Sequence, residues 1–167
     1  MGVEIFVADE QSAVAVDTLR WVQLARDVLK AEGVRGEAEL SMLFIDETAM
    51  ANLNERFLGR DGPTDVLAFP VDEDIVEGGR SPDSGGPGPG FNPPSIAEVP
   101  QMLGDVVICP EVAERNAPLH AGSYDDEVAL LVVHGILHLL GMDHEAETEA
   151  NEMEQRERDL LERFYRR

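Results

Sequence analysis

The 167-residue chain contains very little cysteine, few aromatic residues and no long apolar run. Its single cysteine, Cys109, excludes an internal disulfide and fits a reducing compartment; its apolar context predicts a small buried residue. No segment approaches the roughly 20 apolar residues of a membrane-spanning helix. The first seven residues alternate like a strand and lack the basic start of a signal peptide, so we expect a cytoplasmic protein without membrane contact.

Basic residues are also scarce: 13 of them face 34 acidic residues, and the net charge is −21. This balance argues against broad electrostatic adhesion to nucleic acid, which requires a basic surface. Between residues 36 and 155 the only basic side chains are Arg56, Arg60, Arg80 and Arg115. Any phosphate clamp in this part of the chain must therefore draw on these four arginines.

Histidine is rare but concentrated. Three of the four histidines fall within eleven residues, in the segment His134-Gly-Ile-Leu-His138-Leu-Leu-Gly141-Met-Asp-His144. Two histidines four residues apart on a helix project from the same face. Gly141 is suited to a left-handed helix end, after which His144 can fold back toward the first two. Three imidazoles that leave a fourth position for water are typical of a catalytic zinc site. We therefore predict one Zn²⁺ ion bound by His134, His138 and His144.

The same spacing occurs in metzincin proteases, where the residue after the first histidine is a glutamate that acts as general base. That residue is Gly135 here, so the protease base is missing. Asp105, which we place at the start of a strand, is a candidate base, whereas Asp143 more simply orients a ligand or shapes the turn. His120, outside the motif, is expected to be an ordinary exposed loop residue; its place before the histidine-bearing helix leaves contact with the substrate as the less favoured alternative.

Apolar periodicity and helix-terminal signals predict four strands and five helices in one domain, residues 1–167. We expect the strands at about 3–7, 39–45, 64–69 and 103–109, and the helices at about 17–32, 46–59, 110–116, 123–140 and 147–165. In the second helix, Met50, Leu53 and Phe57 are expected to face inward. The fourth helix is apolar almost all round and therefore buried; bound metal would satisfy the polar nitrogens of its two histidines. The fifth reads as a solvated, charged helix.

Residues 71–101 differ in composition from the rest of the chain. They contain six of the fifteen glycines and six of the ten prolines. Such a segment cannot bury enough apolar surface to offset the entropy of ordering it, so we predict a flexible insertion rather than a lid. The strand before it lies between Pro63 and Pro70, which favours a short strand or one at the sheet edge.

Three blocks of the sequence resemble the YbeY family of bacterial metal-dependent endoribonucleases. They are the histidine motif, the segment Leu53-Asn54 with Pro63-Thr-Asp-Val-Leu-Ala-Phe-Pro70, and Leu103-Gly-Asp-Val-Val-Ile-Cys109. The resemblance implies an α+β fold in which a small mixed sheet packs with helices, and the three motif histidines as zinc ligands. It also implies cleavage of single-stranded RNA in ribosomal RNA maturation and ribosome quality control, with single-stranded RNA, ribosomal RNA and the small ribosomal subunit as partners.

One position departs from the family pattern. Many members carry an arginine directly before the glycine that precedes the Pro-Thr block, whereas this chain has Leu58 before Gly59. Arg56 and Arg60 are the neighbouring residues that can supply the missing charge, and we treat both as catalytic candidates beside Asp105. Two alternatives stay open: a metzincin-like zinc protease, and a non-catalytic ribosome assembly factor whose zinc only holds the fold.

Overall fold

The computed structural model describes residues 3–34, 37–70, 101–141 and 147–165. Its centre is a four-stranded sheet in the order β1-β2-β4-β3, formed by β1 (Val3–Asp9), β2 (Ala38–Phe44), β4 (Gln101–Ile108) and β3 (Val66–Pro70). The first three strands of that order run parallel, and β3 pairs antiparallel with β4. The predicted α+β fold with a mixed four-stranded sheet is confirmed. As the flanking prolines suggested, β3 is short and lies at the edge of this sheet.

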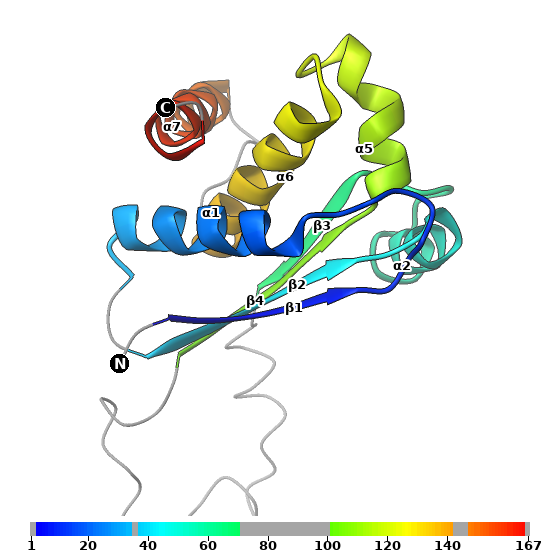
Figure 1. Ribbon diagram of the computed structural model, residues 1–167, viewed down its shortest axis with the longest axis horizontal. Coiled ribbons are helices and arrows are strands. Elements are labelled where there is room, and N and C mark those ends of the chain that lie inside the picture. Colours follow the sequence, from blue (N-terminus) through cyan, green and yellow to red (C-terminus); the bar gives the residue numbers. More distant parts are fainter. Residues whose placement is uncertain (1–2, 35–36, 71–100, 142–146, 166–167) are drawn as a thin grey trace, which may run out of the picture.

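Helices cover both faces of the sheet. On one face lie α1 (Thr18–Ala31), α6 (Tyr124–Leu139) and α7 (Glu147–Phe164) (Figure 1). On the opposite face, α2 (Glu47–Leu58) packs through Met50 against a smaller apolar cluster that includes Leu67 and Val107. The connection from β4 to α6 is made by α5 (Pro110–Asn116) and the short 3₁₀ turn η2 (Ala117–Leu119). No helix in the described ranges is both long and apolar enough to span a membrane.

The helix boundaries follow from residues that were visible in the sequence. The side chains of Asp17, Asp46 and Ser123 accept hydrogen bonds from backbone N–H groups three residues later, as N-caps do. Gly59 ends α2 in a left-handed conformation with φ of 65°. Gly141, just beyond α6, has φ of 99°, as predicted for the stop after the second motif histidine. These local signals are independent of tertiary packing, which is why the sequence revealed them.

The central helix α6 lies unusually close to the sheet at Gly135. A Cβ atom added to this glycine would lie 2.7 Å from Cγ1 of Val106, a fully buried residue of β4. Real side chains do not make such contacts, so the missing side chain permits the close approach of α6 to β4. This contact therefore fixes the distance between the sheet and the residues that precede and follow Gly135. One of them is His134.

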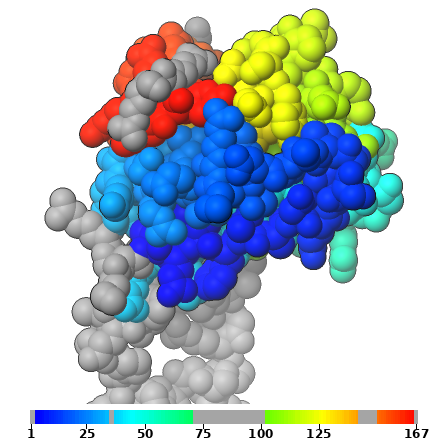
Figure 2. All heavy atoms as spheres, in the orientation of Figure 1, coloured from blue at the N-terminus to red at the C-terminus, as the bar shows by residue number. Residues whose placement is uncertain are grey.

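The last helix is anchored at its C-terminal end. The ring of Tyr165, just after α7, stacks on buried Trp21 of α1 with centroids 6.2 Å apart, and its hydroxyl group donates to Asp126 of α6 at 2.9 Å. The guanidinium of Arg20 lies 5.0 Å from the centroid of the Trp21 ring and 4.9 Å from that of Tyr165. Figure 2 shows α1 in blue with α7 in red and α6 in yellow packed above it. This contact fixes α7 against the domain.

Candidate active site

The two described histidines of the motif lie side by side on α6. His134 and His138 are one helical turn apart, and their ring centroids are separated by 6.4 Å with an angle of 13° between the ring planes. Both side chains are partly buried, so they are held by packing and still reach solvent. The predicted third ligand, His144, lies outside the described residues. Within the described ranges, no group of three histidine, cysteine or acidic side chains is placed to hold a metal ion.

A glutamate from α7 holds the ring of His134. Oε2 of Glu157 lies 2.5 Å from Nδ1 of His134, and the carboxylate is 10% exposed. Metal-ligating histidines commonly donate one ring N–H to a carboxylate, which fixes the tautomer and leaves the other nitrogen for the metal. In that tautomer Nε2 of His134 would be the atom that binds a metal. The pair of parallel imidazoles and the buried carboxylate therefore fit a zinc ion on the basis of donor chemistry.

The sequence interpretation missed Glu157, because α7 was expected to be a solvated helix. A signal was nevertheless present. Met153, Leu160 and Leu161 are buried, and Glu157 lies between them on the same stripe of the helix. An acidic residue on an apolar stripe needs a partner, since burying a lone charge is costly. Here that partner is a histidine of the central helix.

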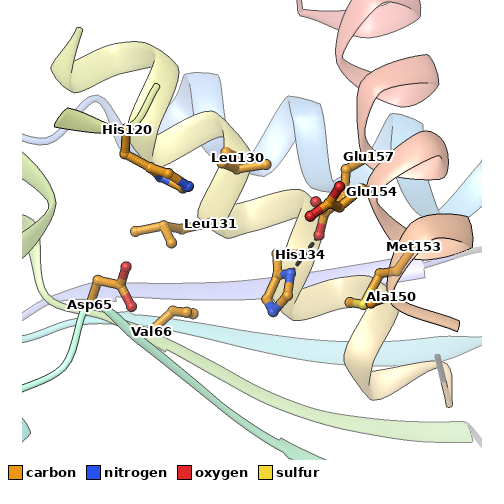
Figure 3. A pocket seen from close by; sticks show the side chains of 10 residues that line it. All are labelled: Asp65, Val66, His120, Leu130, Leu131, His134, Ala150, Met153, Glu154 and Glu157. Atoms are coloured by element: carbon orange, nitrogen blue, oxygen red, sulfur yellow. Dashed lines mark hydrogen bonds and ion pairs between the residues drawn. The ribbon is translucent and has the colours of Figure 1, made fainter. Parts of the chain in front are cut away.

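A cavity of about 360 Å³ opens beside His134 (Figure 3). Its polar lining comes from separate parts of the chain: Asp65 precedes β3, His120 follows η2, and Glu154 and Glu157 belong to α7. The apolar part of the lining is supplied by Val66, Leu130, Leu131, Ala150 and Met153. Figure 3 shows the side chains of His120, Asp65 and His134 around a common space. The charges of this cavity are thus mostly acidic.

A second cavity, of about 540 Å³, also borders His134 and shares Val66 with the first. It follows the edge strand β3 and is lined by both described motif histidines and by Arg60. Arg60 comes directly after the left-handed Gly59, in a loop that Asn54 holds by donating from Nδ2 to the Gly62 carbonyl at 2.9 Å. The structure therefore brings one of the two candidate arginines beside the histidines.

Aromatic side chains form a wall of this second cavity. Phe57 was expected to face inward, but it is 58% exposed and meets Phe69 edge to face with ring centroids 5.4 Å apart. The buried residues of α2 are Met50 and Asn54. Phe57 lies on the same face one turn later, near the end of the helix, where it meets Phe69 of the edge strand instead of the core. Leu58, the position at which the family resemblance led us to expect an arginine, lines the same cavity and is 49% exposed.

The other two catalytic candidates lie away from the histidines. Arg56 lines neither of the two cavities, and its guanidinium lies 5.8 Å from the ring centroid of Phe57. Asp105 was placed at the start of a strand, but β4 begins at Gln101, and Asp105 is exposed in mid-strand. Its neighbour Val106 faces α6, so Asp105 points to the opposite face of the sheet. This position gives no support for Asp105 as the base.

His120 is more than an ordinary loop residue. Its ring is 59% exposed, as expected, but Nδ1 lies 3.0 and 2.9 Å from the two carboxylate oxygens of Glu127. Glu127 is fully buried in the first turn of α6 and also accepts a hydrogen bond from the backbone N–H of Ala121 at 3.1 Å. The structure shows a buried carboxylate that orients a histidine at the cavity.

A family model described as endoribonuclease YbeY matches residues 6–165. Among curated proteins, the endoribonuclease YbeY of Salinispora tropica is 48% identical over 92% of this chain and 89% of its own length. The endoribonuclease YbeY of Beutenbergia cavernae is 45% identical over 90% of this chain and 91% of its own length. That of Mycolicibacterium smegmatis is 42% identical over 98% of this chain and 83% of its own length.

A solved structure has a similar fold. The solution structure of a Thermotoga maritima protein superposes with a TM-score of 0.59 and covers 97% of this chain and 89% of its own chain. The two sequences are 24% identical, so this likeness concerns the fold.

Proposed function

This chain belongs to the endoribonuclease YbeY family, and on that basis we propose that it is a zinc-dependent endoribonuclease specific for single-stranded RNA. We propose that it acts in ribosomal RNA maturation and ribosome quality control, on ribosomal RNA and the small ribosomal subunit, in the cytoplasm. The observation that carries the chemistry is the pair His134 and His138 beside Arg60 in one cavity.

The metal proposal rests on the residues that would hold the ion. His134, His138 and His144 would bind one zinc ion, with Glu157 orienting the first of them. When bound, zinc would act as a Lewis acid at a phosphoryl oxygen and acidify a water molecule, as metal ions do in phosphodiester hydrolysis. Glu157 keeps the His134 ring in one orientation, because its carboxylate is itself held in the packed interface between α6 and α7.

The substrate proposal rests on the lining of the second cavity. Arg60 supplies the positive charge that a phosphate group requires, close to the two histidines. The exposed ring of Phe57, backed by Phe69, is suited to stacking with an unpaired base. Bases stack on aromatic side chains only where they are not paired within a duplex, which supports the preference for single strands.

The metzincin-like protease alternative loses its chemical support at Gly135. This position faces Val106 of the sheet and carries no base. The assembly-factor alternative differs from the proposal in one measurable respect, because it requires zinc for folding and not for catalysis. A folded variant without catalytic metal therefore separates the two.

The decisive experiment compares purified protein with its His138→Ala variant on labelled single-stranded RNA, on the same RNA in a duplex, and on casein. We expect chelator-sensitive cleavage of the single strand that zinc restores, little cleavage of the duplex, and none of casein. The variant should keep its melting transition and lose cleavage and zinc. Cleavage of casein alone would establish the protease, and RNA cleavage that survives both the chelator and the substitution would refute the metal mechanism.

A further inference from the structure

We propose that His120, positioned by Glu127, is the general acid that protonates the leaving ribose oxygen during RNA cleavage. The inference rests on the proposed function and adds a catalytic residue outside the metal-binding motif. It starts from the contact between an exposed imidazole and a fully buried carboxylate, with Nδ1 of His120 3.0 and 2.9 Å from the two oxygens of Glu127.

The first step concerns the atom that His120 presents to the cavity. Glu127 occupies Nδ1, so Nδ1 carries a proton and Nε2 is the nitrogen that exchanges protons with a substrate. The same arrangement of a buried carboxylate behind an imidazole defines the orientation of the histidine in hydrolytic triads. Figure 3 shows the ring of His120 at the cavity that it shares with His134.

The second step concerns position along α6. Glu127 and His134 are seven residues, or two turns, apart, so they lie on the same face of the helix. Their separation along the axis is about 10 Å. His134 borders both cavities, with Arg60 in one and His120 in the other. A phosphodiester bound over His134 would therefore border both the cavity lined by Arg60 and the cavity lined by His120.

The third step concerns charge. The other titratable side chains that face the cavity of His120 are Asp65 from the turn before β3, His134 from α6, and Glu154 and Glu157 from α7. This acidic lining disfavours a permanent phosphate clamp. A proton donor is compatible with such a cavity, because it is needed only at the moment when negative charge develops on the leaving oxygen.

The reaction balances without another reactant. The oxygen of a water molecule forms a bond to phosphorus, and the bond from phosphorus to the leaving ribose oxygen breaks. His120 transfers its Nε2 proton to that oxygen, which leaves as a hydroxyl group. The attacking water releases one proton to solvent, and His120 regains one from solvent. The net change is the consumption of one water molecule.

The test uses a substrate that does not need a general acid. Single-stranded RNA is prepared with one ordinary linkage, or with the bridging oxygen replaced by sulfur on the 3′ or on the 5′ side, because a thiolate leaves without protonation. We expect His120→Gln to slow cleavage of the ordinary linkage by about 10²- to 10⁴-fold, the usual contribution of a general acid. For the linkage with sulfur at the leaving position, the same variant should be less than about tenfold slower than the wild type.

Two variants separate catalysis from structure. Leu119→Ala alters the neighbouring residue, which is 93% exposed, and should leave both rates unchanged. Glu127→Gln removes the charge behind the imidazole. It should slow cleavage of the ordinary linkage more than cleavage of the sulfur linkage, with a smaller loss of rate than in His120→Gln. If His120→Gln does not fold, Glu127→Gln takes its place in the test. Zinc content and melting temperature are measured for each variant and should match the wild type.

Equal losses on oxygen and sulfur substrates, or no loss on either, would overturn the role of His120 and leave the proposed endoribonuclease intact. Failure of the wild-type protein to cleave RNA would overturn the proposed function and this role with it.

Discussion

Glu157 and His134 meet across the interface between α7 and α6, with Oε2 of the glutamate 2.5 Å from Nδ1 of the histidine. Because the carboxylate fixes the ring, Glu157→Gln should weaken zinc binding by about 10- to 100-fold, the usual effect of losing such a partner. Competition with a coloured chelator measures the affinity directly. Glu152→Gln, an exposed change on the same helix, is the matched control. Equal affinities in both variants would contradict the role of Glu157.

Positive charge in the second cavity should control RNA affinity. Arg60→Gln is expected to weaken binding of single-stranded RNA and to reduce the slope of log affinity against log salt concentration by about 1, since one phosphate contact is lost. Arg158→Gln, an exposed change on α7, should alter neither quantity. Fluorescence anisotropy at several salt concentrations provides both numbers. If the two variants behave alike, Arg60 does not contact phosphate.

At Leu58, positive charge can be added to the second cavity instead of removed from it. This leucine lines the same cavity and is 49% exposed, so an arginine at this position can enter without being buried. Leu58→Arg should tighten RNA binding, increase the salt slope by about 1 and raise kcat/KM for RNA cleavage. Leu119→Arg adds the same charge at an exposed position outside this cavity and is the control. An equal gain from both variants would indicate a general effect of net charge on this acidic protein.

The contact between α6 and β4 predicts a stability effect. Gly135→Ala places a methyl group 2.7 Å from Cγ1 of Val106, so we expect a loss of about 1–3 kcal/mol from overpacking, although alanine favours the helix by about 1 kcal/mol. The loss should shrink in a Val106→Ala background and persist in a Val107→Ala background, where the removed atoms lie on the other face. Urea unfolding of the three single variants, the two double variants and the wild type tests this coupling.

Tyr165 predicts how stability depends on pH. Burial and the hydrogen bond to Asp126 raise the pKa of Tyr165 to about 12. The neutral phenol is thus favoured in the folded state; its contribution is complete below pH 10 and is lost as the pH rises toward 12. Tyr165→Phe keeps the ring but cannot titrate, and should cost about 1 kcal/mol near pH 8. Urea unfolding should show this difference shrinking between pH 10 and 12; a constant difference would contradict the prediction.

Most of the fold could be predicted from the sequence, because strands, helices and caps depend on local patterns. Apolar periodicity located all four strands, and Asp17, Asp46 and Ser123 marked the starts of helices to within a residue. The pair His134 and His138 was predicted from spacing alone, and the structure places both side chains at one surface. The zinc ligand set itself stays a prediction.

The partners of these histidines could not be predicted from the sequence in the same way. Glu157 and Glu127 acquire their roles from contacts between segments that fold onto one another, and a charged residue in a helix is more often solvated. Phe57 has the spacing of an inward residue, seven positions after Met50, but it lies near the end of α2 and meets Phe69 of the edge strand, which the spacing does not reveal. Such residues are determined by tertiary packing, and only the structure identifies them.

The close packing of α6 against the sheet at Gly135 also limits which substitutions the histidine motif tolerates. The residue after the first motif histidine points into the hydrophobic interior, toward Val106, and not toward the substrate. Replacing it by the protease glutamate would drive a carboxylate into that interior, so no single codon change can convert one hydrolase into the other. In a hydrolase with this architecture, proton-transfer groups would therefore come from other parts of the chain.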